Sequence, residues 1–110
     1  MKMTVFAAAL LAALSLSGCM TVGHLQKEYR GLGMNTVETQ RGTFKVIDNA
    51  KTGKLFVEPG FGFSITQGTP PLPWAREAAL KWFEMTGRNC TILDGYLFQQ
   101  PHHEFIYTCE

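Results

Sequence analysis

The side chains of this 110-residue chain best suited to chemistry are three cysteines, three histidines and a few carboxylates near expected turns. A cysteine thiolate can be alkylated or can pair in a disulfide, whereas histidines and carboxylates can hold a metal ion or transfer protons. Each of these chemistries needs partner groups at a suitable spacing. The spacing of the individual residues therefore decides which chemistry the sequence supports.

The histidines do not have the spacing of a metal site. His102 and His103 are adjacent and are followed by Glu104, while His24 lies far upstream. Adjacent residues of an extended segment point to opposite sides, whereas a metal ion needs three or four ligands that converge. We therefore expect solvated turn residues here, and neither a metal nor another cofactor.

The remaining carboxylates and Ser64 do not form a catalytic arrangement either. Asp94 and Glu104 both fall near expected turns, and Ser64 has no base at a recognisable spacing. The glycines at positions 60 and 62 precede no predicted helix that could bind phosphate. The sequence therefore predicts no catalytic residues, and we expect a protein that is not an enzyme.

The first eighteen residues have the three parts of an export signal. Lys2 gives a positive start, an apolar core runs from Val5 to Leu14, and small residues follow at Ser15, Ser17 and Gly18. The apolar core is about half as long as the roughly 20 residues of a permanent transmembrane helix. Residues 1–18 are therefore predicted to be a signal peptide that is removed after export.

The run Leu16-Ser17-Gly18-Cys19 resembles the lipobox of bacterial lipoproteins. The resemblance implies a diacylglycerol on the Cys19 sulfur, cleavage between Gly18 and Cys19, and a further acyl chain on the new amino group. Because each buried methylene contributes roughly 0.8 kcal/mol, several such chains would hold the protein on a membrane. An ordinary signal peptide with an incidental cysteine is the alternative.

Met20 and the charge balance bear on location and partners. In Gram-negative lipoproteins an aspartate after the lipidated cysteine favours retention in the inner membrane, so Met20 implies the outer membrane, with the domain facing the periplasm. A Gram-positive host would have no outer membrane. Lys2 is the only charge in the signal, so the rest of the chain has equal numbers of basic and acidic residues. We therefore expect a membrane contact through the lipid and an unidentified envelope protein as partner, but no nucleic acid.

The chain after the signal divides into a tether and one small domain. Residues 19–41, in which apolar residues follow no period, are predicted to form a lipidated tether. A flexible segment of about twenty residues would reach on the order of 25 Å. A short helix from Leu25 to Arg30 that packs on the domain is the competing interpretation. Residues 42–110 are predicted to form a small α+β domain.

Local patterns define the elements of this domain. Thr43–Asp48 and Lys54–Glu58 predict two antiparallel strands, and Phe61–Ile65 is either a third strand or an irregular loop. A helix is predicted over Trp74–Thr86, with Pro73 in its first turn and Gly87 as a left-handed cap. Its expected apolar stripe consists of Ala75, Ala78, Ala79, Trp82 and Phe83.

Two more strands are expected near the end of the sequence. Thr91–Leu93 and Tyr96–Phe98 flank Asp94-Gly95, where we expect a bulge or bend, and Phe105–Tyr107 forms the other strand. The domain is therefore predicted to be an antiparallel sheet of four or five short strands with one helix packed on a face.

Cys90 and Cys109 bracket these last strands. In an exported chain, two cysteines left after lipidation form a disulfide by default, and a loop of roughly 20 residues makes the bond worth on the order of 3 kcal/mol. A turn centred on Pro101-His102 would place Cys109 opposite Asp94. The strand must therefore bend at Gly95, or Cys90 must lie at the corner between helix and strand.

The order of features from Thr43 to Cys109 resembles small lipoproteins of Gram-negative bacteria. These features are the strand pair, a helix that ends at Thr86-Gly87-Arg88, then Cys90, Ile92 and Asp94-Gly95, and a closing run Glu104-Phe105-Ile106-Tyr107-Thr108-Cys109. The resemblance implies an envelope lipoprotein with paired Cys90 and Cys109 and no activity. We expect a non-enzymatic binding or structural accessory module. The alternative is an inhibitor or phage superinfection-exclusion lipoprotein that blocks an enzyme or surface receptor through the loop Gln99–His103.

Overall fold

The computed structural model describes residues 16–60 and 68–110. The chain divides into two units, residues 1–30 and residues 31–110. The first unit contains helix α2 (Leu16–Glu28). Residues 20–28 of the predicted tether are therefore helical, and the run Leu25 to Glu28 consists of good helix formers. Among the described residues, no helix combines the length and apolar character needed to cross a membrane.

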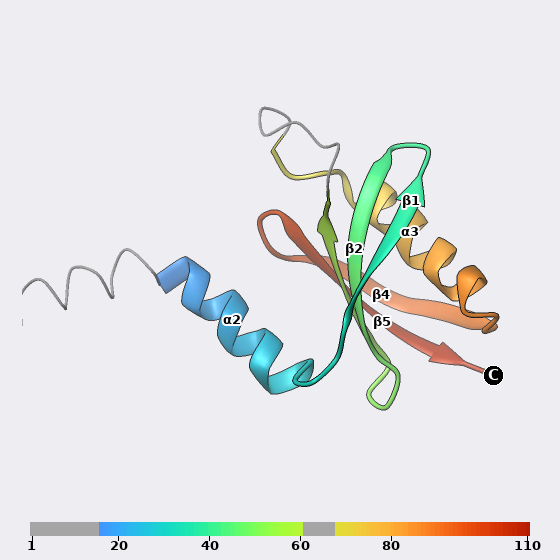
Figure 1. The fold of residues 1–110 in the computed structure, drawn as a ribbon, viewed down its shortest axis with the longest axis horizontal. Helices are drawn as coiled ribbons and strands as arrows, with labels where there is room; N and C mark the ends of the chain where they lie inside the picture. The colour runs from blue at the N-terminus through green and yellow to red at the C-terminus, as the bar shows by residue number, and fades with distance from the viewer. Residues whose placement is uncertain (1–15, 61–67) are drawn as a thin grey trace, which may run out of the picture. The chain divides into compact units, whose positions relative to one another are not determined.

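The second unit is a five-stranded antiparallel sheet with one helix packed on a face, so the predicted α+β class is confirmed (Figure 1). The strands are β1 (Met34–Thr39), β2 (Gly42–Asn49), β3 (Lys54–Pro59), β4 (Cys90–Gln99) and β5 (His102–Cys109). Their order across the sheet is β1-β2-β3-β5-β4. The helix is α3 (Leu72–Met85), which contacts all five strands.

Strand β1 lies within the segment that the sequence assigned to the tether. Residues 34–39 pair with β2, with Val37 opposite Phe44. Only Val37 is fully buried, whereas Met34, Thr36 and Glu38 are exposed. An edge strand that buries one side chain has little hydrophobic periodicity, which is why the pattern failed to indicate it.

The core lies between α3 and the sheet. Its strand residues include Val46, Leu55 and Phe105, and its helix residues are the predicted stripe of Ala75, Ala78, Ala79 and Phe83, with the predicted Trp82 partly buried. The alanines have no exposed surface, so the helix backbone lies close to the sheet while the larger side chains fill the space around it.

The end of α3 confirms the predicted glycine cap. Gly87 has a φ of 67°, a conformation that glycine adopts without steric cost. The Arg88 N–H donates to the Phe83 carbonyl at 3.0 Å, and the Gly87 N–H donates to the Glu84 carbonyl at 3.1 Å. This pair of bonds is a Schellman motif, which satisfies the last carbonyls of the helix.

The predicted β2–β3 hairpin is also confirmed, and its turn contains a glycine that no other residue can replace easily. Gly53 has a φ of +69°, and a Cβ there would lie 2.4 Å from the Tyr107 carbonyl oxygen. The Gly53 carbonyl in turn accepts a hydrogen bond from the Tyr107 N–H at 2.8 Å. The turn therefore fits directly against β5.

We predict that Gly53→Ala lowers the free energy of unfolding by about 2 kcal/mol, since it adds a steric clash to the cost of a positive φ. Gly68→Ala is the matched control, because Gly68 has a φ of +67° but none of the described residues comes within 4 Å of its Cβ position. Urea denaturation of both variants separates the cost of the positive φ, which both share, from the cost of the clash with Tyr107, which only Gly53→Ala has. Equal losses in the two variants would show that the contact with Tyr107 contributes nothing.

The pairing of β4 with β5 explains how Cys90 meets Cys109. Gln99 pairs with His102, so the turn is centred one residue before the predicted centre at Pro101-His102. Strand β4 contains two bulges, one between Ile92 and Asp94 and one between Leu97 and Gln99. Each bulge shifts the pairing with β5 by one further residue, so that Cys90 lies opposite Cys109. The bulge expected near Asp94 is therefore confirmed. The possible strand at Phe61–Ile65 lies outside the described residues.

Candidate functional site

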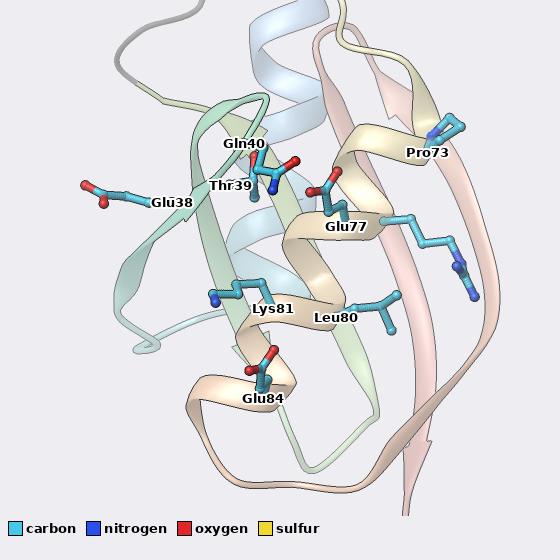
Figure 2. Close-up of a pocket in the computed structure, with 9 residues that line it drawn as sticks. Glu38, Thr39, Gln40, Pro73, Glu77, Leu80, Lys81 and Glu84 are labelled. Atoms are coloured by element: carbon cyan, nitrogen blue, oxygen red, sulfur yellow. The ribbon is translucent and has the colours of Figure 1, made fainter.

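A surface groove runs between α3 and the β1 edge of the sheet (Figure 2). It has a volume of about 620 Å³ and is lined by Glu38, Thr39, Gln40, Pro73, Arg76, Glu77, Leu80, Lys81 and Glu84. A second hollow of about 490 Å³ adjoins it and is lined by Thr36, Glu38, Lys81 and Met85. We call these two hollows, together with the free edge of β1, the edge groove.

The backbone of β1 has a free edge whose orientation follows from the neighbouring strands. The Thr43 carbonyl accepts a hydrogen bond from the Gly60 N–H at 2.7 Å, on the β3 side of β2. Glu38 is the β1 partner of Thr43, so it directs its own N–H and C=O away from β2. By alternation, Thr36 and Met34 do the same. Within the described residues, no other strand pairs with this edge of β1.

The opposite edge of the sheet is protected in a way that β1 is not. Strand β4 carries both bulges, and its exposed Leu93 lies between the paired residues Ile92 and Asp94. Bulges interrupt the regular row of backbone groups that another strand needs for pairing. The pairing of β1 with β2 has no such irregularity. Strand β1, which forms one side of the edge groove, is therefore the regular open edge of this sheet.

Charged side chains of both signs surround the edge groove. Lys81 extends toward β1 and lies between Glu77 and Glu84 along α3 (Figure 2). On the other face of the sheet, the Lys45 ammonium donates to the Thr36 hydroxyl at 2.7 Å. This bond holds the lysine side chain over the edge strand. The groove thus offers main-chain hydrogen bonds together with alternating charges, which suits contact with a polypeptide.

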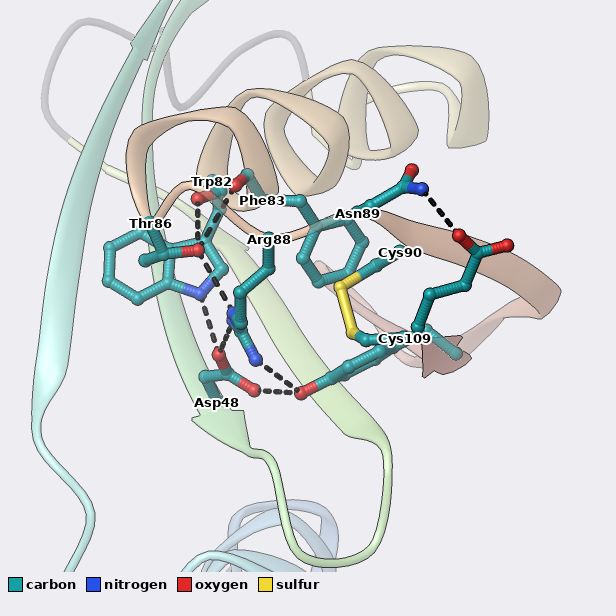
Figure 3. Close-up of a disulfide and its surroundings, with 10 residues drawn as sticks. Asp48, Trp82, Phe83, Thr86, Arg88, Asn89, Cys90 and Cys109 are labelled. Carbon is teal, nitrogen blue, oxygen red and sulfur yellow. Dashed lines mark hydrogen bonds and ion pairs between the residues drawn. A yellow bond between two sulfur atoms is a disulfide. The ribbon is translucent and has the colours of Figure 1, made fainter.

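A second cluster, centred on Asp48, lies at the end of the sheet near the disulfide (Figure 3). The Asp48 carboxylate accepts hydrogen bonds from the Trp82 indole at 2.8 Å, from the Tyr107 hydroxyl and from Arg88. The Arg88 guanidinium also lies 5.6 Å from the centre of the Phe83 ring. Because three donors occupy Asp48, this cluster fastens the end of α3 to β2 and β5 rather than presenting a reactive group.

The pKa values of the cluster follow from burial and hydrogen bonding. Burial raises the pKa of Tyr107 to about 12, and the hydrogen bond to Asp48 adds to this effect. Burial lowers the pKa of Arg88, but the hydrogen bonds to Tyr107 and Asp48 outweigh it, so that this pKa is raised overall. The ionised arginine and the neutral tyrosine are therefore the stable forms.

The Tyr107 pKa predicts a loss of stability in alkaline solution. An unfolded tyrosine ionises near pH 10, while folded Tyr107 keeps its proton until about pH 12. Its contribution is therefore fully present below pH 10 and is lost as the pH rises toward 12. We expect wild-type stability to fall more steeply above pH 10 than that of Tyr107→Phe in urea denaturation. Parallel pH profiles would contradict this assignment.

Cys90 and Cys109 form the predicted disulfide. They are directly paired residues of β4 and β5, with their Cα atoms 4.0 Å apart. The bond therefore closes the end of the β4–β5 hairpin beside the Asp48 cluster (Figure 3). The lipidation of Cys19 remains a prediction, because the side chain of this residue lies outside the described part of the molecule.

The two histidines near the β4–β5 turn are not solvated turn residues, so that expectation is wrong: His103 is buried and His102 is half-buried. The His102 ring bonds to the Glu58 carboxylate at 3.0 Å and stacks on Phe56 at 5.1 Å. His103 is 3% exposed, and burial lowers its pKa, with a further contribution from the charge of His102. His103 is buried because β5, which begins at His102, is an inner strand of the sheet.

Asp94 and Glu104, the carboxylate pair considered in the sequence, lie in different surroundings. Glu104 is buried and accepts a hydrogen bond from the Tyr96 hydroxyl, whereas the exposed Asp94 accepts from the Gly95 N–H at 2.9 Å. Ser64 lies outside the described residues, and His24 belongs to the first unit. Across the described ranges, no three histidine, cysteine or acidic side chains converge to hold a metal ion.

The chain matches no protein-family model, no curated protein and no solved structure. The resemblance to Gram-negative lipoproteins therefore stays a prediction. The site residues that sequence reasoning missed are Thr36, Glu38 and Lys81 of the edge groove and Asp48, Trp82, Arg88 and Tyr107 of the cluster. No local motif marks either group, because each is assembled from several strands and α3.

Proposed function

We propose that this protein is a lipid-anchored module of the bacterial cell envelope that acts by contact, as a non-enzymatic binding or structural accessory protein. The edge groove is its contact surface. The observation that carries this proposal is the regular free edge of β1, which presents main-chain groups at Met34, Thr36 and Glu38 beside a charged helix. An exposed strand edge of this kind binds another polypeptide by adding a strand to the sheet.

The positions of the charged side chains also support a contact role. Asp48 is paired with Arg88, and Glu58 is paired with His102. These pairs fix the fold, whereas Glu38 and Lys81 line an open surface. The membrane anchor is the acylated Cys19, and Met20 favours the outer membrane, with the domain in the periplasm.

The anchor is tested by expressing the full chain in a Gram-negative host with radiolabelled palmitate. We expect label in the wild type, none in Cys19→Ser, and retained label in Met20→Asp. Membrane fractionation should place the wild type in the outer membrane and Met20→Asp in the inner membrane. An unlabelled wild-type protein that fractionates as soluble would remove the anchor from the proposal.

The contact surface is tested separately by photo-crosslinking in the same cells. A photoreactive residue replaces Met85, which lines the edge groove, or Leu93, which is also more than half exposed and lies on the bulged β4 edge. We expect a discrete polypeptide adduct at position 85 and none at position 93. Adducts of equal yield at both positions would show that the edge groove has no special role.

A further inference from the structure

We propose that the occupant of the edge groove is a second copy of this chain, which pairs antiparallel with β1 to make one sheet that continues across both copies. This inference rests on the proposed function, which takes the edge groove as the contact surface. It adds the identity of the partner and the register in which the two strands meet.

The register follows from which backbone groups face outward. Met34, Thr36 and Glu38 direct their N–H and C=O groups away from β2. In antiparallel pairing, outward residues of one strand must lie opposite outward residues of the other. A two-fold axis through Thr36 meets this condition for the whole strand. It places Thr36 opposite Thr36 of the second copy and Met34 opposite Glu38 of the second copy.

The charges on the face opposite α3 are complementary in this register. Lys45 pairs with Thr36 in the β1–β2 ladder, and its ammonium is held on the Thr36 hydroxyl at 2.7 Å. Glu38 of the second copy lies on the same face, diagonal to Thr36, within reach of a long side chain. Each interface therefore brings two Lys45–Glu38 pairs of opposite charge together, one on each side of the axis.

The α3 side of the edge groove can also lie next to the same surface of a second copy. Lys81 points toward β1 from between two glutamates (Figure 2), and the adjoining Met85 is 54% exposed. A two-fold axis through Thr36 places the two α3 helices on the same face of the joined sheet, one on each side of the axis. Their mixed charges can then pair, and both copies of Met85 lose solvent exposure, which favours association.

The other edge of the sheet explains why association would stop at two copies. Pairing of β1 with β1 uses the same surface on both molecules and is therefore closed. Further growth would need β4, whose two bulges interrupt regular pairing. The two edges thus give a dimer rather than a fibre.

The test is a disulfide between two copies at the proposed axis. The full chain is purified in detergent with Thr36→Cys or, as a matched control, with Lys51→Cys in the exposed β2–β3 turn. Residues opposite each other in a hydrogen-bonded pair have Cα atoms about 5.5 Å apart, which suits a disulfide. Under mild oxidation we expect a covalent dimer for Thr36→Cys, and only the background of the unaltered chain for Lys51→Cys. Equal yields for both variants, or none for Thr36→Cys, would overturn the inference.

Charge exchange tests the register with the same readout. In the Thr36→Cys background, Glu38→Lys or Lys45→Glu alone places like charges together, and we expect at least a fivefold lower crosslinking rate. The double exchange Glu38→Lys/Lys45→Glu should restore the rate. Failure of this rescue would refute the register. A disulfide from position 36 to a different envelope protein in cells would refute the second copy as occupant while leaving the proposed function in place, and palmitate labelling reports on the anchor alone.

Discussion

The double variant Cys90→Ser/Cys109→Ser is expected to lose about 3 kcal/mol of unfolding free energy, because the disulfide closes a loop with a sequence separation of 19 residues. A domain of this size obtains only about 3–5 kcal/mol from its core. The loss therefore brings the folded and unfolded states close to balance. Urea denaturation followed by tryptophan fluorescence measures the change through Trp74 and Trp82.

Reduction of the wild-type protein with dithiothreitol is the control for this variant. Reduced wild type and the double serine variant should have the same midpoint, because both lack the loop constraint. A double variant that stays within 1 kcal/mol of the oxidised wild type would show that the β4–β5 pairing holds the end of the sheet without the bond.

Asp48→Ala is expected to destabilise the domain by a similar amount, about 3 kcal/mol. The change leaves the Trp82 indole and the Tyr107 hydroxyl without their shared acceptor and removes the partner of the Arg88 guanidinium. An unsatisfied buried donor costs about 1–3 kcal/mol, and Arg88, whose side chain is 27% exposed, recovers part of its loss by hydration.

Two further variants make this prediction specific. Asp48→Asn keeps one acceptor oxygen for Trp82 and should lose about half as much unfolding free energy as Asp48→Ala.

Asp94→Ala is the surface control. It removes an exposed carboxylate that bonds to the neighbouring Gly95 N–H, and surface changes of this kind fall within about 0.5 kcal/mol. Chemical denaturation orders the three variants. A loss in Asp48→Ala no greater than in Asp94→Ala would refute the structural role of the cluster.

Elements with a local hydrophobic period were predictable from the sequence. The stripe Ala75, Ala78, Ala79 and Phe83 predicts α3, and the alternation in β2 and β3 predicts their hairpin, because each element buries a whole face in the core. Strand β1 was missed because Val37 is its only fully buried residue. The pairing of Cys90 with Cys109 was predictable, but its register depended on two bulges that no local pattern fixes.

The polar clusters were not predictable for a different reason. Asp48 bonds to Trp82, 34 residues away, and to Tyr107, 59 residues away. Their proximity follows from the order of the strands, which places β5 next to β3 and not at an edge. The edge groove likewise exists only because β1 is outermost. Both sites are properties of topology, which residue spacing along the chain does not encode.

The position of β5 also determines when the domain can fold. It follows every other strand in the chain and yet lies between β3 and β4 in the sheet. During synthesis, β1 to β3 therefore emerge without the neighbour that covers β3, and the core stays incomplete until β5 has been made. If the chain is exported during synthesis, as the amino-terminal signal predicts, this strand order prevents the core from closing before β5 has emerged.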